Sequence, residues 1–362
     1  MRLIQQFTNK RKSNRNSHNL VVAVKEIKSV ALVTEIHEKI EIWLLVLPTL
    51  FCLLSVQAVG STIERNGFVI EGPLIPVNEI YSGGPARDGI PSLDKPVFIR
   101  AHEAEFLIPS DKLIGVSLNG IEKAFPIAIL NYHELVNDYF GRQSITISYC
   151  PLCGTGMAFN AKVKGDPLVF GVSGLLYNND MLMYDRKTHS LWSQIKGRAI
   201  SGPLKGEYLQ QVPVEHTTWR AWRERYPETL VLSNKTGFRR NYGSDPYPHY
   251  ENSSRLIFPL TDYDRRYSTK ELVIGLRVGN KAKAYPFVEL ARGQAAVMEA
   301  FVFTDTVNGQ TFTVEYHDKD KSARILDSSG HLVASVTAYW FAWMAFHPES
   351  EVYTFKDEKA SD

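Results

Sequence analysis

Two stretches of the chain share most of their pattern, and this repeat constrains the fold more than any other feature. Ile114–Pro126 reads IGVSLNGIEKAFP, and Ile274–Pro286 reads IGLRVGNKAKAYP. Each predicts a β-hairpin, because an apolar strand is followed by an Asn-Gly or Gly-Asn turn and a second strand. Pro ends each stretch and favours the first turn of a helix. The predicted helices are Ile127–Tyr139 and Phe287–Ala300.

The same order of elements continues beyond each predicted helix. Strand-like alternation follows in Ser144–Tyr149 and in Thr311–Tyr316. The pattern W-x-A-W-x4-P-E then occurs once from Trp219 and once from Trp340. Tryptophans three residues apart lie on one helical face, so each pair is predicted to pin a short helix to a sheet. An exposed aromatic shelf for a ligand is the alternative interpretation.

The repeat therefore predicts an α+β fold that is rich in β-structure and contains two related modules produced by internal duplication. Each module would comprise a β-hairpin, a helix, strands and a short Trp-containing helix. The expected segments are a leader (1–58), an N-terminal extended arm (59–108), module one (109–233), an irregular linker (234–269) and module two (270–362), a degenerate copy. The linker is predicted to be irregular because it is rich in Tyr, Asp, Pro and Ser.

Composition excludes several classes of protein. Hydrophobic residues make up 44% and charged residues 22% of the chain, which is ordinary for a globular protein and excludes intrinsic disorder of its bulk. The formal net charge is +2, and basic and acidic residues are interspersed, so we expect no nucleic-acid partner. Only one apolar run approaches membrane-spanning length, which excludes a polytopic membrane protein.

That apolar run, Ile42–Val56, carries no charge and follows a basic stretch. As a helix it would extend about 22 Å, which is short of a typical hydrocarbon core. It is typical of a signal peptide cleaved after Ala58, and an uncleaved anchor over residues 42–59 is the alternative. We therefore expect an exported protein, periplasmic or extracellular, that meets a membrane only through this segment. Its partner is expected to be a small molecule, a metal ion or another protein.

The chemistry of module one centres on the sequence CPLCGT, which begins at Cys150. The C-x-x-C spacing brings the sulfurs of Cys150 and Cys153 to one point, which suits a disulfide, a redox-active dithiol or two corners of a metal site. The only other cysteine, Cys52, lies in the leader, so His, Asp or Met would have to complete a metal site. Module two has VEYHDKDKSARILD at the equivalent place, without cysteine, which indicates that module one holds the site.

An insertion of module one, Gly171–Gln194, brings further candidates. Leu182–Tyr184 and Leu191–Gln194 are predicted to be two strands joined by a turn at Arg186–Thr188. Met181 and Met183 are soft ligands that would select copper, or else they fill the core. His189 is a further ligand candidate or a loop residue. The polar and aromatic residues expected around the cysteines are Asn178, Asp180, Asp185, Trp192 and Gln194.

His216 is the last candidate. It directly precedes Thr217 and Thr218, either of which can cap the Trp219 helix, so the positive helix end would disfavour its protonation. A neutral imidazole is a good ligand or base. We therefore expect Cys150, Cys153 and His216 to bind zinc or copper, or the cysteines to act as a redox pair. The alternatives are an enzyme with Cys150 as nucleophile and His216 or Asp185 as its partner, and a structural or interaction protein with a Cys150–Cys153 disulfide.

Several long motifs resemble the DUF3179 family of bacterial and archaeal proteins. They are YSGGPARDGIPSLDKP (81–96), SYCPLCGTGMAF (148–159), FGVSGLLYNNDMLMYDRKTHSLWSQ (170–194), SGPLKGEYL (201–209), the Trp219 motif as far as Ser233, and DPY (245–247). The resemblance covers nearly everything after the leader. It implies an exported domain with a CPLC-type motif, and it supplies no reaction.

Overall fold

Both predicted hairpins form in the computed structural model, which describes residues 62–260, 262–295 and 300–356. The predicted leader lies outside these residues. In the first hairpin Ile114 pairs with Phe125, and in the second Ile274 pairs with Tyr285. Asn119 and Gly120 have positive φ angles of 57° and 71°, as the tight turn between the first two strands requires. The strands are β5 (Lys112–Leu118), β6 (Ile121–Pro126), β19 (Leu272–Val278) and β20 (Lys281–Pro286).

Each hairpin has neighbouring strands of the same two kinds in its sheet. An antiparallel strand flanks the first strand of the hairpin, and a parallel strand flanks the second. Around β5 and β6 these are β17 (Glu215–Thr218) and β18 (Leu230–Leu232), and around β19 and β20 they are β24 (Val336–Tyr339) and β25 (Glu351–Val352). The edge strand β4 (Phe98–Arg100), from the predicted arm, completes the first sheet in the order β17-β5-β6-β18-β4.

One sheet joins strands from both predicted modules. Its order is β25-β20-β19-β24-β9-β8-β7, and β16 also pairs with β9. Gly156 of β9 is the residue at the junction, because it pairs with Tyr149 on β8 and with Thr337 on β24. The strands from module one are β7 (Leu135–Phe140), β8 (Gln143–Cys150), β9 (Thr155–Asn160) and β16 (Gln210–Val212).

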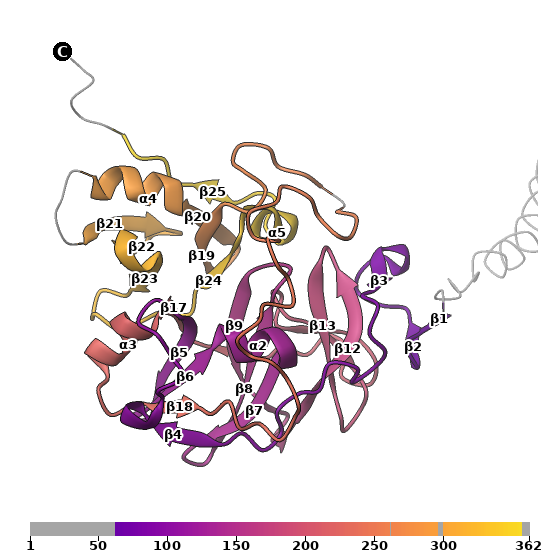
Figure 1. Cartoon of the computed structure of the whole chain (residues 1–362). Helices are drawn as coiled ribbons and strands as arrows, with labels where there is room; N and C mark the ends of the chain where they lie inside the picture. Colours follow the sequence, from indigo (N-terminus) through magenta and orange to yellow (C-terminus); the bar gives the residue numbers. More distant parts are fainter. Residues whose placement is uncertain (1–61, 261, 296–299, 357–362) are drawn as a thin grey trace, which may run out of the picture. The chain divides into compact units, whose positions relative to one another are not determined.

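The insertion of module one builds a separate five-stranded sheet, and the two strands predicted there form and pair. Its order is β15-β14-β13-β12-β3, and every neighbouring pair is antiparallel. The strands are β3 (Ile80–Ser82), β12 (Phe170–Tyr177), β13 (Asp180–Asp185), β14 (Leu191–Ser193) and β15 (Arg198–Ser201). Figure 1 shows β12 and β13 beside β7, β8 and β9. The remaining strands are the hairpins β1 (Thr62–Arg65) with β2 (Phe68–Glu71) and β10 (Lys162–Val163) with β11 (Asp166–Pro167), and the sheet β21 (Phe301–Val307), β22 (Gln310–His317) and β23 (Ser322–Leu326).

The described residues hold four α-helices among many strands, so the expectation of a β-rich α+β fold is confirmed. They are α2 (Ile127–His133), α3 (Trp219–Arg225), α4 (Phe287–Gln294) and α5 (Trp340–Phe346). The prediction of a helix through Tyr139 was wrong. Glu134 has a φ angle of +57° and ends α2, and the following residues pair with β8 instead. The second helix also ends earlier than expected, at Gln294.

The paired tryptophans are core residues, as their spacing predicted. Trp222 and Trp343 are fully buried, and each covers a glycine of the neighbouring hairpin. A Cβ atom at Gly115 would lie 2.3 Å from the Trp222 ring, and one at Gly275 would lie 2.2 Å from the Trp343 ring. Only glycine allows so close an approach, so these packing contacts depend on both partners. Within the described ranges, no helix is long and apolar enough to cross a membrane.

Candidate metal centre

The CPLC motif forms the turn that joins β8 to β9. Cys150 pairs with Thr155 across the turn, and the backbone N–H of Cys153 donates to the carbonyl of Cys150 at 3.2 Å. Pro151 occupies the second position of this turn, where its fixed φ angle is favourable. Gly154 follows with a φ angle of +60°, which glycine adopts without strain. The local sequence therefore curls the chain so that both thiols lie on its inner side.

A second turn brings an acid to these thiols. Asn178 and Asn179 join β12 to β13 with φ angles of 50° and 64°, the left-handed conformation that asparagine tolerates well. The carbonyl oxygen of Asn179 lies 3.6 Å from Sγ of Cys150. The Asn179 side chain also holds the linker, since it bonds backbone groups of Phe258 and Pro259. Asp180 is the first residue of β13 and therefore lies beside the cysteine turn.

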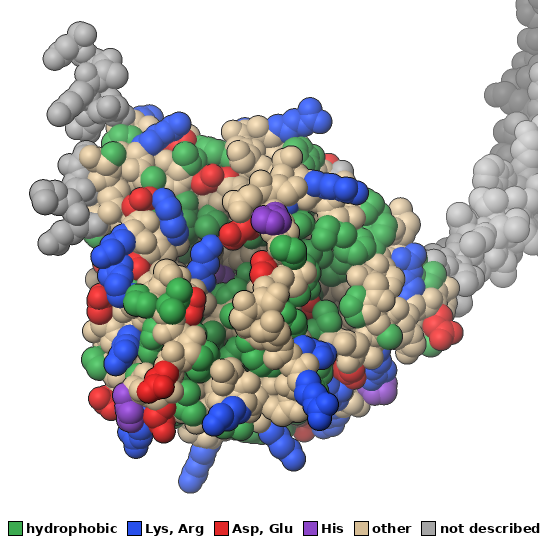
Figure 2. Space-filling model, in the orientation of Figure 1, with side chains coloured by type: hydrophobic (Ala, Val, Ile, Leu, Met, Phe, Trp, Pro, Cys, Tyr) green, Lys and Arg blue, Asp and Glu red, His purple; other side chains and the backbone are tan. Residues whose placement is uncertain are grey.

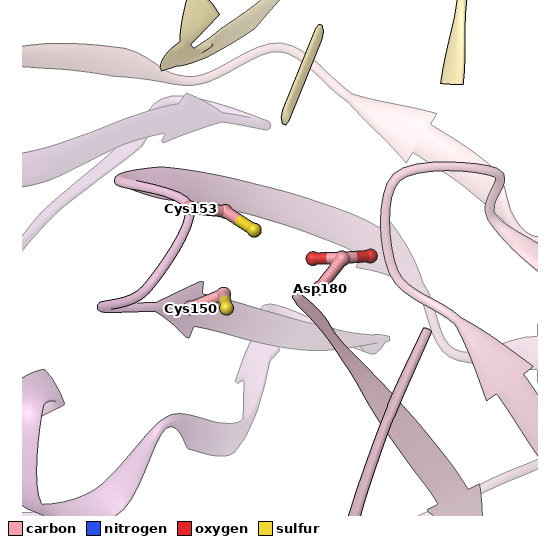
Figure 3. A group of neighbouring side chains, drawn as sticks. All are labelled: Cys150, Cys153 and Asp180. Carbon is pink, nitrogen blue, oxygen red and sulfur yellow. The ribbon is translucent and has the colours of Figure 1, made fainter. Parts of the chain in front are cut away.

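Cys150, Cys153 and Asp180 form a group that could bind a metal ion. One ligand atom from each residue lies within 4.8 Å of the other two. Figure 3 shows the Cys153 sulfur directed toward the Asp180 carboxylate, with Cys150 on the adjoining strand. All three are buried, at 2%, 0% and 0% exposure. Both cysteines are free thiols in the structure.

Burial dominates the electrostatics of this group. It raises the pKa of Asp180 to about 8, although backbone N–H groups of Ile195 and Met181 act in the opposite direction. Burial and the neighbouring Cys150 also raise the pKa of the Cys153 thiol. A nucleophilic cysteine needs a lowered pKa, so the environment of Cys153 is unlike that of an activated nucleophile. A bound cation would instead stabilise the charged forms of all three side chains.

Glu134 is a second buried acid that our sequence analysis missed. It lines one cavity together with Cys150 and Tyr247, and burial raises its pKa to about 8. We missed Glu134 because the predicted helix through Tyr139 gave no reason to expect this residue to be buried beside the cysteines. The available signal was the apolar stretch that follows, in which Leu135 and Val136 begin a buried strand.

His216 lies on the other side of the β8–β9 pair. Neighbouring residues of a strand point to opposite faces, so Tyr149 and Cys150 face different ways. The His216 imidazole covers Gly156, and its Nε2 donates to the Gly156 carbonyl at 3.1 Å. Burial lowers the pKa of His216 to about 4. The imidazole is therefore neutral near pH 7, as we predicted, but mainly because it is buried. Thr218 caps α3, but His216 itself belongs to β17.

A family model described as "Protein of unknown function (DUF3179)" matches residues 87–350, which include every residue of this site. The chain belongs to this family. Searches of curated proteins and of solved structures found no match. In this DUF3179 protein the function must therefore be argued from the site itself.

The other predicted residues have identifiable local roles in this DUF3179 chain. Asp185 caps the turn after β13, where its carboxylate accepts from Thr188 and from Nε1 of Trp192. This pair lies in the five-stranded sheet and does not belong to the group formed by the cysteines. Gln194 is closer to them, because its amide donates to Ser148 Oγ and to the carbonyl of Thr155, which pairs with Cys150.

The two methionines and His189 are also placed by the structure. Met181 and Met183 are buried in the core cluster that includes both cysteines. Met181 lines the cavity beside Cys150, and Met183 pairs with Trp192 across the strands. His189 has a φ angle of +59° in the turn after β13, and its ring meets Tyr184 edge-on. Met181 and Met183 are therefore core residues, and His189 is a turn residue.

Proposed function

We propose that this protein binds a zinc ion through Cys150, Cys153 and Asp180, and that metal binding is its function. Cysteine thiolates and carboxylate oxygens are both ligands that zinc binds, and zinc takes a fourth ligand in a tetrahedral arrangement. The single observation that carries the proposal is the convergence of three buried ligand atoms within 4.8 Å.

An unpaired oxygen supports this proposal. Oδ2 of Asp180 accepts from the backbone N–H of Ile195 at 3.1 Å, but Oδ1 has no hydrogen-bond partner among the described residues. Leaving a buried polar atom unpaired costs about 1–3 kcal/mol. A metal ion at the cysteines would provide that partner. It would also remove the cost of burying the charged carboxylate.

The donor atoms favour zinc over copper. Cu(I) prefers soft sulfur and imidazole donors, whereas zinc also accepts carboxylate oxygen. The structure places His216 on the opposite side of the strand pair and places Asp180 beside the thiols. Glu134 lines the same cavity as Cys150, and its carboxylate would add a further oxygen donor near the site.

Metal analysis of the reduced full chain tests the proposal. We expect about one zinc per chain after reconstitution, and at least about a hundredfold weaker binding in Cys150→Ser, Cys153→Ser and Asp180→Asn, because each removes one of three ligands. Asp166→Asn is the matched control for Asp180→Asn, since it makes the same chemical change at an exposed residue outside the site. Competition with a chromophoric chelator measures each zinc affinity.

Several outcomes of this experiment would contradict the proposal or one part of it. A wild-type chain that retains no zinc under reducing conditions contradicts it. Unchanged affinity in Asp180→Asn contradicts the role of the carboxylate, and preferred retention of Cu(I) contradicts the choice of zinc. A reversible Cys150–Cys153 disulfide in a chain that binds no metal would favour the redox alternative.

We further propose that the two modules, 109–233 and 270–362, arose by internal duplication and that 234–269 links them. Matching strand neighbours around β5–β6 and β19–β20 support this proposal. So do matching backbone hydrogen bonds, because Trp219 N donates to Asp111 O and Trp340 N donates to Glu271 O. The cysteine turn would then be a feature that one copy carries alone.

Export of the protein also remains a proposal, supported by the basic stretch and the apolar run before Ala58. The metal ion is the partner that we propose. In the periplasm or outside the cell, zinc binding would protect two neighbouring thiols from oxidation, because thiolates held by a metal are not available for disulfide formation.

A further inference from the structure

A cleft lies between the two modules, on the face of the β8–β9 pair opposite to the cysteine thiols. Its volume is about 840 Å³, including the part open to solvent. Tyr149 and His216 line it from module one, Thr337 and Tyr339 line it from module two, and Tyr250 lines it from the linker. Figure 2 shows this side of the molecule hollowed, with apolar side chains inside and charged ones near the rim.

Sheet geometry explains why tyrosines gather here. Tyr149 and Thr337 both pair with Gly156, so they share one face of the sheet, and Tyr339 follows Thr337 by two residues on that face. Gly154 has no side chain, which allows the phenol end of Tyr339 to lie against the cysteine turn. A Cβ atom there would be 3.0 Å from Cζ of Tyr339.

Two of these tyrosines have hydroxyl groups without a partner among the described residues. Tyr149 and Tyr339 are each 8% exposed, and neither hydroxyl makes a hydrogen bond within the described residues. Buried tyrosine hydroxyls usually find a partner. In that part of the chain no ring contact joins Tyr149, Tyr250 and Tyr339 to one another, and all three line the cleft.

The charges of the cleft leave one acid uncompensated. Among the described residues, Asp245 has no basic partner; its carboxylate accepts only from the Asn131 side chain and the Tyr247 N–H. The other charged side chains of the cleft are paired: Lys112 with Glu251, Lys321 with Asp318, and Asp320 with Arg220. Burial is the main cause of the raised pKa values of Tyr149 and Tyr339, and the nearby charges of Glu251 and Asp245 add to the effect.

The protein already places one ammonium group on a tyrosine of this cleft. Nζ of Lys270 lies 3.5 Å from the centre of the Tyr250 ring and also donates to the carbonyl oxygens of Tyr250 and Arg255. An ammonium group is attracted to the negative face of an aromatic ring. Among the described residues, no Lys or Arg lies over the rings of Tyr149 and Tyr339, so the same interaction is available there to a ligand.

We infer that the cleft binds a small organic cation with an ammonium group, held by the Tyr149 and Tyr339 side chains and neutralised by Asp245. The parts of the two phenol groups that line the cleft contact the cation, and the Asp245 carboxylate provides the counter-charge. The ligand class is therefore an amine or a quaternary ammonium compound. This site uses none of the three proposed zinc ligands, so its test does not depend on zinc binding.

A pair of probes with one shape and different charge tests the inference. Choline carries a quaternary ammonium, and 3,3-dimethylbutan-1-ol replaces the nitrogen with carbon. Saturation-transfer NMR titrations with the full chain measure both affinities. We expect choline to bind at least about tenfold more tightly, because only choline gains the charge and ring interactions.

Variants locate the binding and provide the control. Asp245→Asn should weaken choline binding about tenfold and leave the neutral probe unchanged, and Tyr149→Phe should weaken it about threefold. Asp166→Asn is the matched control, since it removes an exposed charge elsewhere and should change nothing. Near-UV circular dichroism verifies folding, and Tyr149→Phe serves alone if Asp245→Asn misfolds. Equal affinities for the probes, no choline binding, or an unchanged affinity in a folded cleft variant would overturn the inference.

Discussion

The hairpins β5–β6 and β19–β20 have matching strand neighbours, but the turns that follow them along the chain differ. In module one the turn between β8 and β9 is CPLCG, and its thiols meet Asp180. In module two the corresponding turn between β22 and β23 contains Asp318, Asp320 and Lys321, whose charges pair at the surface or with module one. The same strand framework therefore supports a buried group of potential ligands in one module and charged surface pairs in the other.

This difference indicates that the turn residues determine which ligand atoms are available, whereas the Trp–Gly contacts hold the hairpins and helices together. Trp222 donates a hydrogen bond from Nε1 to Thr229, and Trp343 donates from Nε1 to Ser350. Each tryptophan covers the glycine of its own hairpin. These shared contacts should matter equally in the two modules, whereas residues found in one module alone should have one-sided effects.

The largest effect is expected from the shared tryptophans. Trp222→Ala and Trp343→Ala should each lower the free energy of unfolding by about 3–5 kcal/mol, because each removes a buried indole and leaves a cavity. Urea denaturation followed by circular dichroism measures both values. A difference of more than about 2 kcal/mol between the variants would break the comparison. If either fails to fold, the Trp→Phe pair provides the same test with a smaller effect.

A smaller effect is expected at the start of the Trp helices. The Thr218 hydroxyl accepts from the Ala221 N–H and caps α3, whereas Tyr339 at the start of α5 makes no side-chain cap. Thr218→Ala should therefore cost about 1 kcal/mol of unfolding free energy or more, because it removes the cap and also the hydrogen bond from this hydroxyl to Asp320. Thr218→Ser keeps the hydroxyl and is the matched control. Equal stability of the alanine and serine variants would show that the cap contributes nothing.

The smallest effect at neutral pH is expected at His347, which occupies in module two the position that Tyr226 occupies in module one. Both rings pack on the preceding tryptophan, at 4.4 Å and 4.1 Å between ring centres. Burial, with Arg277 and Lys196 nearby, lowers the pKa of His347 to about 4. An unfolded histidine titrates near pH 6.5, so between pH 6.5 and 4 the unfolded state binds more protons, and stability falls as the pH falls.

His347→Tyr should therefore reduce the loss of stability between pH 6.5 and pH 4 and change little above pH 7. Urea midpoints at four pH values in this range measure the effect. His216 also has a lowered pKa and remains in the variant, so part of the acid sensitivity should persist. An unchanged pH profile would contradict the role of His347.

Prediction from the sequence succeeded where short-range patterns decide the structure. The Asn119–Gly120 turn, the strands on either side of it and the buried Trp pairs follow from residue spacing and turn chemistry. Prediction failed at Glu134, where a residue other than glycine adopts a positive φ angle and ends α2. For Asp185 the sequence left two interpretations open, a place near the cysteines or a turn cap, and its carboxylate accepts from Thr188 in its own turn.

The sequence by itself determined that Cys150 and Cys153 share one turn, because Pro151 and Gly154 favour that turn locally. Only the tertiary structure decided which side chains surround it. Asp180 comes from a different sheet, and His216 covers Gly156 on the opposite face. Spacing within a strand specifies the alternation of its faces, but the stacking of sheets depends on contacts between residues far apart in the chain.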